Sequence, residues 1–193
     1  MNNYKKITYN GRPMGTSQKE FGELRRSDDV KGNSEELQHR MKEDGYLFIP
    51  GLLGRDNVKA ASISTAKRLA SFGYLAEGSS LEKCIAAPDG DPSPVITTKE
   101  HLHFAIDENP EINHMIFGDI LMGIFKIFLN GKPIYLKNLS RFRTNFPRTP
   151  AVNVHCDAPY MGRGTQFIYT TWVPLGDINF EQGGLMILEH SHN

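Results

Sequence analysis

The first regular pattern of apolar positions lies between Asn33 and Gly45. Leu37 and Met41 are four residues apart, so on a helix they share a face. Asn33 and Glu36 have the spacing of a capping box, and a glycine such as Gly45 is typical of a helix C-terminus. The pattern therefore predicts a helix that begins near Asn33 and ends at Gly45.

The residues that follow predict a strand and then a second helix. Residues 46–50 form a short apolar run that ends in proline, which is typical of a short buried strand. Residues 56–72 then follow a helical pattern, and Gly73 is expected to close it.

The strongest helical pattern in the chain begins at Asn109. Asn109 suits the N-cap, and Pro110 suits the first position of a helix. Asn130 and Gly131 mark its end. The buried face is predicted from apolar residues at helical spacing: Ile112, Met115, Ile116, Ile120, Ile124 and Phe128. We expect one continuous core helix packed on a sheet.

The last third of the chain has the character of strands separated by turns. Residues 165–173 are rich in β-branched and aromatic side chains, which favour strands. Other strand-like segments are residues 134–146, 152–154 and 185–188, while the proline- and glycine-rich residues 77–94 predict a loop or lid. Helices first and strands later indicate an α+β class, with helices that brace a mostly antiparallel sheet.

The length and composition are those of one globular domain. The chain has 193 residues, of which 39% are hydrophobic and 23% charged. Lys and Arg number 22 and Asp and Glu also number 22, so net charge gives no reason to expect binding to nucleic acid or to a membrane surface. We expect a polar, irregular arm over residues 1–32 and one domain over residues 33–193.

The two cysteines, Cys84 and Cys156, are too few for a disulfide framework. The first residues lack the apolar core of a secretory signal, and no apolar run approaches the roughly 20 residues of a membrane span. Together these features predict a cytoplasmic protein with reduced thiols.

A histidine and an aspartate two residues apart, His155 and Asp157, follow the apolar run at residues 151–154. Side chains two positions apart on a strand share a face. An imidazole and a carboxylate there supply two of the three ligands of a 2-His-1-carboxylate site, which leaves positions on iron open for oxygen and a cosubstrate. The pair therefore predicts a metal site, and Cys156 between them is expected to point away.

Four short segments occur in an order and at a spacing that match one protein family. They are residues 44–53 (DGYLFIPGLL), residues 155–157 (HCD), residues 171–177 (TWVPLGD) and residues 181–192 (EQGGLMILEHSH). Together they resemble the phytanoyl-CoA dioxygenase family over residues 44–192. In place of the glycine of the family's closing Gly-Ser-His motif, this chain has His190.

The resemblance implies a fold, a reaction and a set of site residues. The family has a double-stranded β-helix, a jelly roll related to the cupins. Its members are iron(II)- and 2-oxoglutarate-dependent dioxygenases that mostly hydroxylate small molecules. The resemblance implies that His155 and Asp157 are iron ligands and that Trp172 and Phe142 contact the 2-oxoglutarate cosubstrate. It assigns no catalytic side chain beyond these.

The family's distal histidine ligand and its 2-oxoglutarate-binding basic residue lie beyond the last segment matched here. The resemblance therefore implies a barrel that is incomplete at its C-terminal side, with unpaired strand edges through which the chain could self-associate. One alternative is a catalytically inactive jelly-roll binding module. Another is a cupin-like metal enzyme without 2-oxoglutarate, which would need His190 or His192 as a ligand.

Two arginines suggest what kind of small molecule the site takes. Arg141 and Arg143 alternate with Phe142 and Thr144 in a strand-like segment. Such a pair either faces solvent or points into the barrel, where a guanidinium suits a carboxylate or a phosphate. The second case predicts an acidic substrate.

Overall fold

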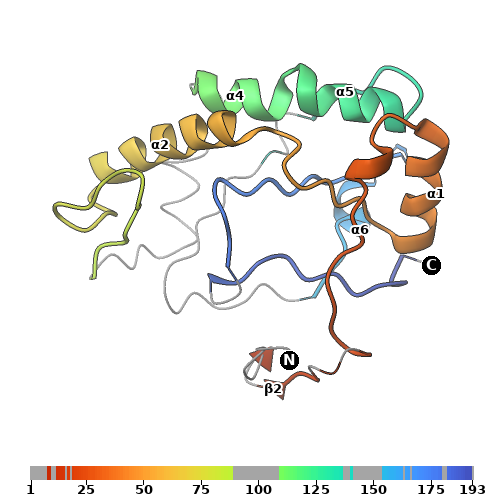
Figure 1. Ribbon diagram of the computed structural model, residues 1–193, viewed down its shortest axis with the longest axis horizontal. Helices are drawn as coiled ribbons and strands as arrows, with labels where there is room; N and C mark the ends of the chain where they lie inside the picture. The colour runs from red at the N-terminus through yellow and green to blue at the C-terminus, as the bar shows by residue number, and fades with distance from the viewer. Residues whose placement is uncertain are drawn as a thin grey trace. The chain divides into compact units, whose positions relative to one another are not determined.

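The computed structural model describes residues 8–9, 12–15, 17, 19–88, 109–136, 140, 154–162, 164–165, 167–179 and 182–192. The chain forms two compact units. The helical unit comprises Arg25–Phe146 and Val173–Asn193, and the smaller unit comprises Met1–Leu24 and Pro147–Trp172. Helices α1, α2, α4 and α5 belong to the first, and β1, β2 and α6 to the second (Figure 1).

Helix α1 spans Ser34–Asp44, as the sequence predicted. The Asn33 side chain accepts a hydrogen bond from the backbone N–H of Glu36 at 3.2 Å, so Asn33 is the N-cap. Gly45 follows the helix in the left-handed region, with φ 79°. The Glu36 carboxylate does not complete a capping box, because it accepts a hydrogen bond from Arg40 instead.

Helix α2 spans Arg55–Ser71, within one residue of the predicted bounds. Gly73, with φ 74°, ends it as expected. The predicted loop that follows is confirmed over residues 77–88, which form turns closed by one antiparallel bridge between Leu75 and Ala86. Residues 89–94 of that prediction lie outside the described residues.

The single helix predicted after Asn109 is wrong, because the chain forms two helices there. Asn109 caps α4, which spans Pro110–Phe117, and accepts from the backbone N–H of Ile112 at 3.0 Å. Helix α5 then spans Asp119–Phe128. Gly118 separates them with extended backbone angles, φ −76° and ψ 174°.

The break at Gly118 also changes which residues are buried. Ile112, Met115 and Phe128 are buried as predicted. Ile120, however, is 44% exposed, and Leu121 is buried in its place at 8%. The new helix starts with a different rotation about its axis, so the apolar stripe counted through Gly118 does not continue in phase.

The helical unit is built on pairwise helix contacts. Helix α2 packs on α4, α4 contacts α5, and α5 contacts α1 (Figure 1). Ala61, Ile112 and Met115 form a buried cluster. Val173 and Leu175 pack against that cluster, so a segment from the predicted strand region contacts the helices directly.

Regular strands are short in the part of the chain that is described. Strand β1 (Thr8–Tyr9) pairs antiparallel with β2 (Arg12–Pro13). The predicted strand at residues 46–50 is reduced to one parallel bridge between Phe48 and Arg26.

The predicted double-stranded β-helix is not tested by the described residues. Residues 167–173 and 183–188 lack strand pairing within the described ranges, and much of residues 137–153 lies outside them. Short helices η1 (Asp28–Val30) and α6 (Ala158–Met161) complete the regular structure of the described ranges. The jelly roll stays a prediction, as does the single domain over residues 33–193.

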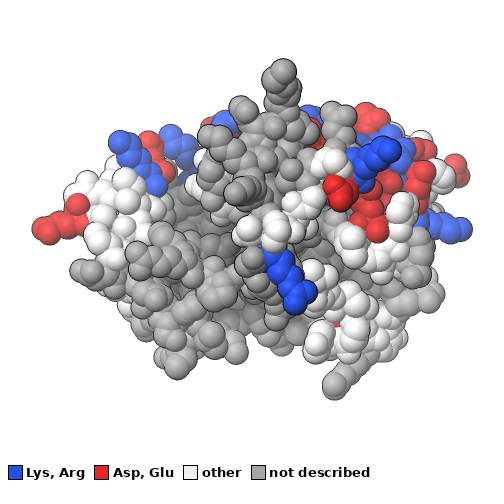
Figure 2. Space-filling view, turned by 90° about the horizontal axis from the view of Figure 1, so that it is seen from below, with Lys and Arg blue, Asp and Glu red and all other residues white. Residues whose placement is uncertain are grey.

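Acidic and basic side chains lie next to one another on the described surface in the view of Figure 2. This agrees with the equal numbers of acidic and basic residues in the chain. None of the described helices has the length and apolar character needed to cross a membrane.

Candidate functional site

His155 and Asp157 lie together in the smaller unit. The distance from His155 Nε2 to Asp157 Oδ1 is 3.5 Å, and the two side chains are 43% and 40% exposed. Their polar atoms therefore converge, and both side chains are partly exposed to solvent. Cys156 between them is also exposed and is a free thiol, as is the partly buried Cys84.

Asp157 stands at the start of a helix without using its side chain as a cap. It directly precedes α6, and its backbone carbonyl accepts hydrogen bonds from the N–H groups of Tyr160 and Met161, both at 3.0 Å. Its side chain makes no capping hydrogen bond. The carboxylate is thus available to other partners, although aspartate at this position commonly caps.

One of those partners is Thr170, which sequence reasoning did not single out. Thr170 Oγ1 donates to Asp157 Oδ2 at 2.7 Å. A usable signal was present in the sequence, because Thr170 and Trp172 are two apart in the predicted strand at residues 165–173 and would share a face.

The other residues predicted for the site are only partly described. Trp172 belongs to the same unit as His155 and Asp157 and is 48% exposed. An indole with that exposure can present a face to a small molecule. Phe142, Arg141 and Arg143 lie outside the described residues, so their roles stay predictions.

The two converging groups suit a divalent cation such as iron(II). Imidazole nitrogen and carboxylate oxygen each bind such an ion at about 2.0–2.2 Å, so two donors on one ion lie at most ~4.4 Å apart. The 3.5 Å between Nε2 and Oδ1 satisfies that limit. Among the described residues, no third His, Cys, Asp or Glu completes a cluster with them.

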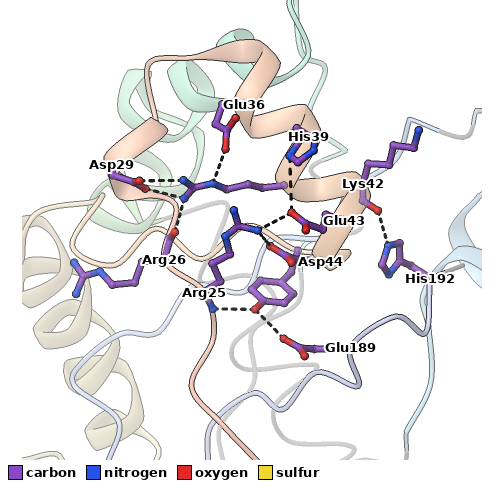
Figure 3. A network of polar contacts seen from close by, with 12 residues as sticks. Arg25, Arg26, Asp29, Glu36, His39, Lys42, Glu43, Asp44, Glu189 and His192 are labelled. Atoms are coloured by element: carbon purple, nitrogen blue, oxygen red, sulfur yellow. Dashed lines mark hydrogen bonds and ion pairs between the residues drawn. The ribbon is translucent and has the colours of Figure 1, made fainter.

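His192, one of the two alternative ligands, is engaged elsewhere. Its Nε2 donates to the backbone carbonyl of Lys42 in α1 at 3.0 Å (Figure 3). Its Nδ1 edge faces Gly45 so closely that a Cβ there would overlap the ring. A metal-binding role for His192 would require this contact to break.

The contact of His192 is part of a wider attachment of residues 189–192 to α1. The Tyr46 hydroxyl donates to Glu189 Oε1 at 3.3 Å and accepts from the backbone N–H of Arg25 at 2.9 Å (Figure 3). Burial raises the pKa of Tyr46. Two of the segments that carry the family resemblance, at residues 44–53 and 181–192, therefore touch each other.

Comparison with known proteins gives one informative similarity. The chain is 25% identical over 171 residues to the 1-deoxypentalenic acid 11-beta-hydroxylase of Streptomyces arenae. The match covers 82% of this chain but 54% of the relative, so the chain spans about half the length of the curated relative it matches. No family model matches the chain, and no solved structure matches it significantly.

The chain is thus similar, over most of its length, to an oxidoreductase of the hydroxylase type. That agrees with the oxygenase function inferred from the motifs. Membership of the phytanoyl-CoA dioxygenase family stays a prediction.

Proposed function

We propose that the chain carries the metal-binding part of an iron(II)- and 2-oxoglutarate-dependent dioxygenase that hydroxylates a small molecule. The observation that carries the proposal is the convergence of His155 Nε2 and Asp157 Oδ1, 3.5 Å apart. The similarity to a hydroxylase supports an oxidative reaction. The predicted double-stranded β-helix is the fold in which this site would sit.

The roles of the side chains follow from their chemistry. His155 in its neutral form and Asp157 as a carboxylate would hold the ion on one side, which leaves its other side to small molecules. With iron(II) bound there, dioxygen would be the oxidant: one of its oxygen atoms would enter the substrate as the hydroxyl, and the other would convert 2-oxoglutarate into succinate and carbon dioxide. Trp172 would form a wall of the pocket that holds 2-oxoglutarate beside the ion and would limit the access of water to it.

The substrate in this proposal is a small acid. The relative's name specifies an acid as its substrate. Arg141 and Arg143 would bind the carboxylate of such an acid if they point into the predicted barrel, because a guanidinium suits that group. Self-association of the chain stays a prediction.

Metal titration of four proteins tests the proposal. Wild type, His155→Ala, Asp157→Asn and Cys156→Ser are titrated with iron(II) without oxygen, and succinate formation from 2-oxoglutarate is then measured in air. We expect wild type and Cys156→Ser to bind alike, because Cys156 lies between the ligands without being one. His155→Ala and Asp157→Asn should each weaken binding by at least about tenfold.

The result is decisive in either direction. Equal binding by all four proteins, or no binding by the wild type, would refute the metal role. Metal binding together with 2-oxoglutarate-dependent succinate release would exclude the alternative of an inactive jelly-roll module.

A further inference from the structure

The hydroxyl of Thr170 holds one oxygen of the Asp157 carboxylate. Thr170 Oγ1 and Asp157 Oδ2 are 2.7 Å apart, at the short distance typical of a hydrogen bond to a charged acceptor. A carboxylate accepts only, so the hydroxyl is the donor.

Because of this hydrogen bond, the two carboxylate oxygens of Asp157 have different partners. Oδ2 accepts from Thr170, while Oδ1 is the oxygen that lies 3.5 Å from His155 Nε2. The terminal torsion of an aspartate is broad, so an unheld carboxylate samples many orientations. The Asp157 side chain makes no capping bond at α6, and among the described residues the Thr170 hydroxyl donates a hydrogen bond to it that restricts its rotation.

We propose that Thr170 is a positioning residue for a divalent cation bound by His155 and Asp157. The Oγ1–Oδ2 hydrogen bond keeps Oδ1 turned toward His155 Nε2, so that one oxygen rather than two faces the ion. This inference rests on the proposed function. Partners that orient a ligand in this way typically contribute a factor of about 10–100 to metal affinity.

Substitutions at Thr170 can test the proposal without disturbing the core. Thr170 is exposed, so its replacement leaves no cavity in the core. Thr170→Val removes the hydroxyl and keeps the branched shape, while Thr170→Ser keeps the hydroxyl. Thr171, also exposed, is next in the chain, and Thr171→Val is the matched control.

The experiment measures Mn²⁺ binding by the electron paramagnetic resonance signal of the free ion, on the full 193-residue chain. We expect Thr170→Val to bind about 10- to 100-fold more weakly than the wild type. Thr170→Ser and Thr171→Val should bind within about threefold of it. Thermal unfolding of all variants checks that the fold is retained.

The possible outcomes separate this inference from the proposed function. If the wild type binds Mn²⁺, His155→Ala abolishes binding and Thr170→Val binds normally, the positioning role is overturned and the metal site stands. The positioning role is also overturned if Thr170→Ser binds as weakly as Thr170→Val, because the hydroxyl would then be irrelevant. If the wild type binds no Mn²⁺, both proposals are overturned.

Discussion

Several single residues adopt backbone angles that their side chains do not favour. His190 has φ 61°, in the left-handed region where glycine is most comfortable. The motif that this chain resembles has a glycine at that position. Histidine adopts a positive φ more often than most residues other than glycine, so His190 fits a position that would suit glycine.

Replacement of Gly45 by alanine should destabilise the protein for two separate reasons. The φ of Gly45, 79°, disfavours any side chain, and a Cβ would overlap the His192 ring. Gly73 has a similar φ of 74° with nothing near its Cβ position, so it is a matched control. We expect Gly73→Ala to cost about 1–2 kcal/mol from the left-handed strain.

Gly45→Ala should cost about 1 kcal/mol more than Gly73→Ala, because the displaced His192 loses its hydrogen bond to Lys42. Urea unfolding of both variants measures the difference. Combination of Gly45→Ala with His192→Ala should remove the additional cost. Equal losses for the two single alanine variants would show that the His192 contact contributes nothing.

At the residue scale, the sequence singled out His155 and Asp157 by their spacing together with the ordered segments of the family resemblance. The structure brings their polar atoms to 3.5 Å, and their metal role stays a prediction. The two-residue spacing from Trp172 was not enough to single out Thr170, since a hydroxyl has no motif of its own and its partner Asp157 is 13 residues away in the chain. The sequence also could not assign His192 to α1, because the contact joins residues 150 positions apart.

At the scale of elements, the helices were the most predictable parts of the chain. The ends of α1 and α2 agree with the sequence because their caps, Asn33, Gly45 and Gly73, are local signals. The division between α4 and α5 was missed, since glycine inside a long apolar pattern is often tolerated in a helix. The strands depend on pairing between distant segments, and local sequence does not specify it.

Replacement of Gly118, the residue between α4 and α5, should destabilise the protein. A Cβ on Gly118 would overlap the backbone carbonyl of His114, which cannot move as a side chain can. We expect Gly118→Ala to destabilise the protein by about 1–3 kcal/mol through this overlap. Chemical denaturation followed by far-UV circular dichroism measures the change.

Gly123 provides the control, because it lies inside α5 with nothing near its Cβ position. Gly123→Ala should stabilise the protein by about 0.5–1 kcal/mol, since alanine has the higher helix propensity. A Gly118→Ala variant that is as stable as the wild type would mean that α4 and α5 can merge into one helix.

At the scale of the whole molecule, charge balance hides a local concentration of ion pairs in the helical unit. The Arg40 side chain is only 9% exposed and donates to both oxygens of Asp29, at 2.8 and 3.0 Å, and to Glu36 (Figure 3). It also donates to the carbonyl of Arg26 at 2.6 Å. The net charge of the chain gives no sign of this network.

The network predicts a loss of stability in acid. The hydrogen bond from Arg40 lowers the pKa of Asp29 below its ordinary value. A carboxyl group with a lowered folded-state pKa stabilises the protein above its unfolded pKa of about 3.9, and this contribution is lost as the pH falls through the folded value. The wild type should therefore lose stability between about pH 5 and pH 2.

Asp29→Asn should be less stable than the wild type at pH 7, and its stability should depend less on pH in that acidic range. Glu82→Gln is the control, because Lys59 also lowers the pKa of Glu82 but that pair is exposed to solvent. At pH 7, Glu82→Gln should lose less stability than Asp29→Asn. Urea unfolding from pH 7 to pH 2 tests this, and identical curves for Asp29→Asn and the wild type would refute it.

The position of the chain's single tryptophan has a practical consequence for how unfolding can be followed. Trp172 is half exposed in the smaller unit, whereas α1, α2, α4 and α5 all belong to the helical unit. Indole fluorescence thus reports on one unit, while helical ellipticity reports mainly on the other. Coincident denaturation curves from the two probes would indicate that the units melt cooperatively, and separated curves that each melts by itself.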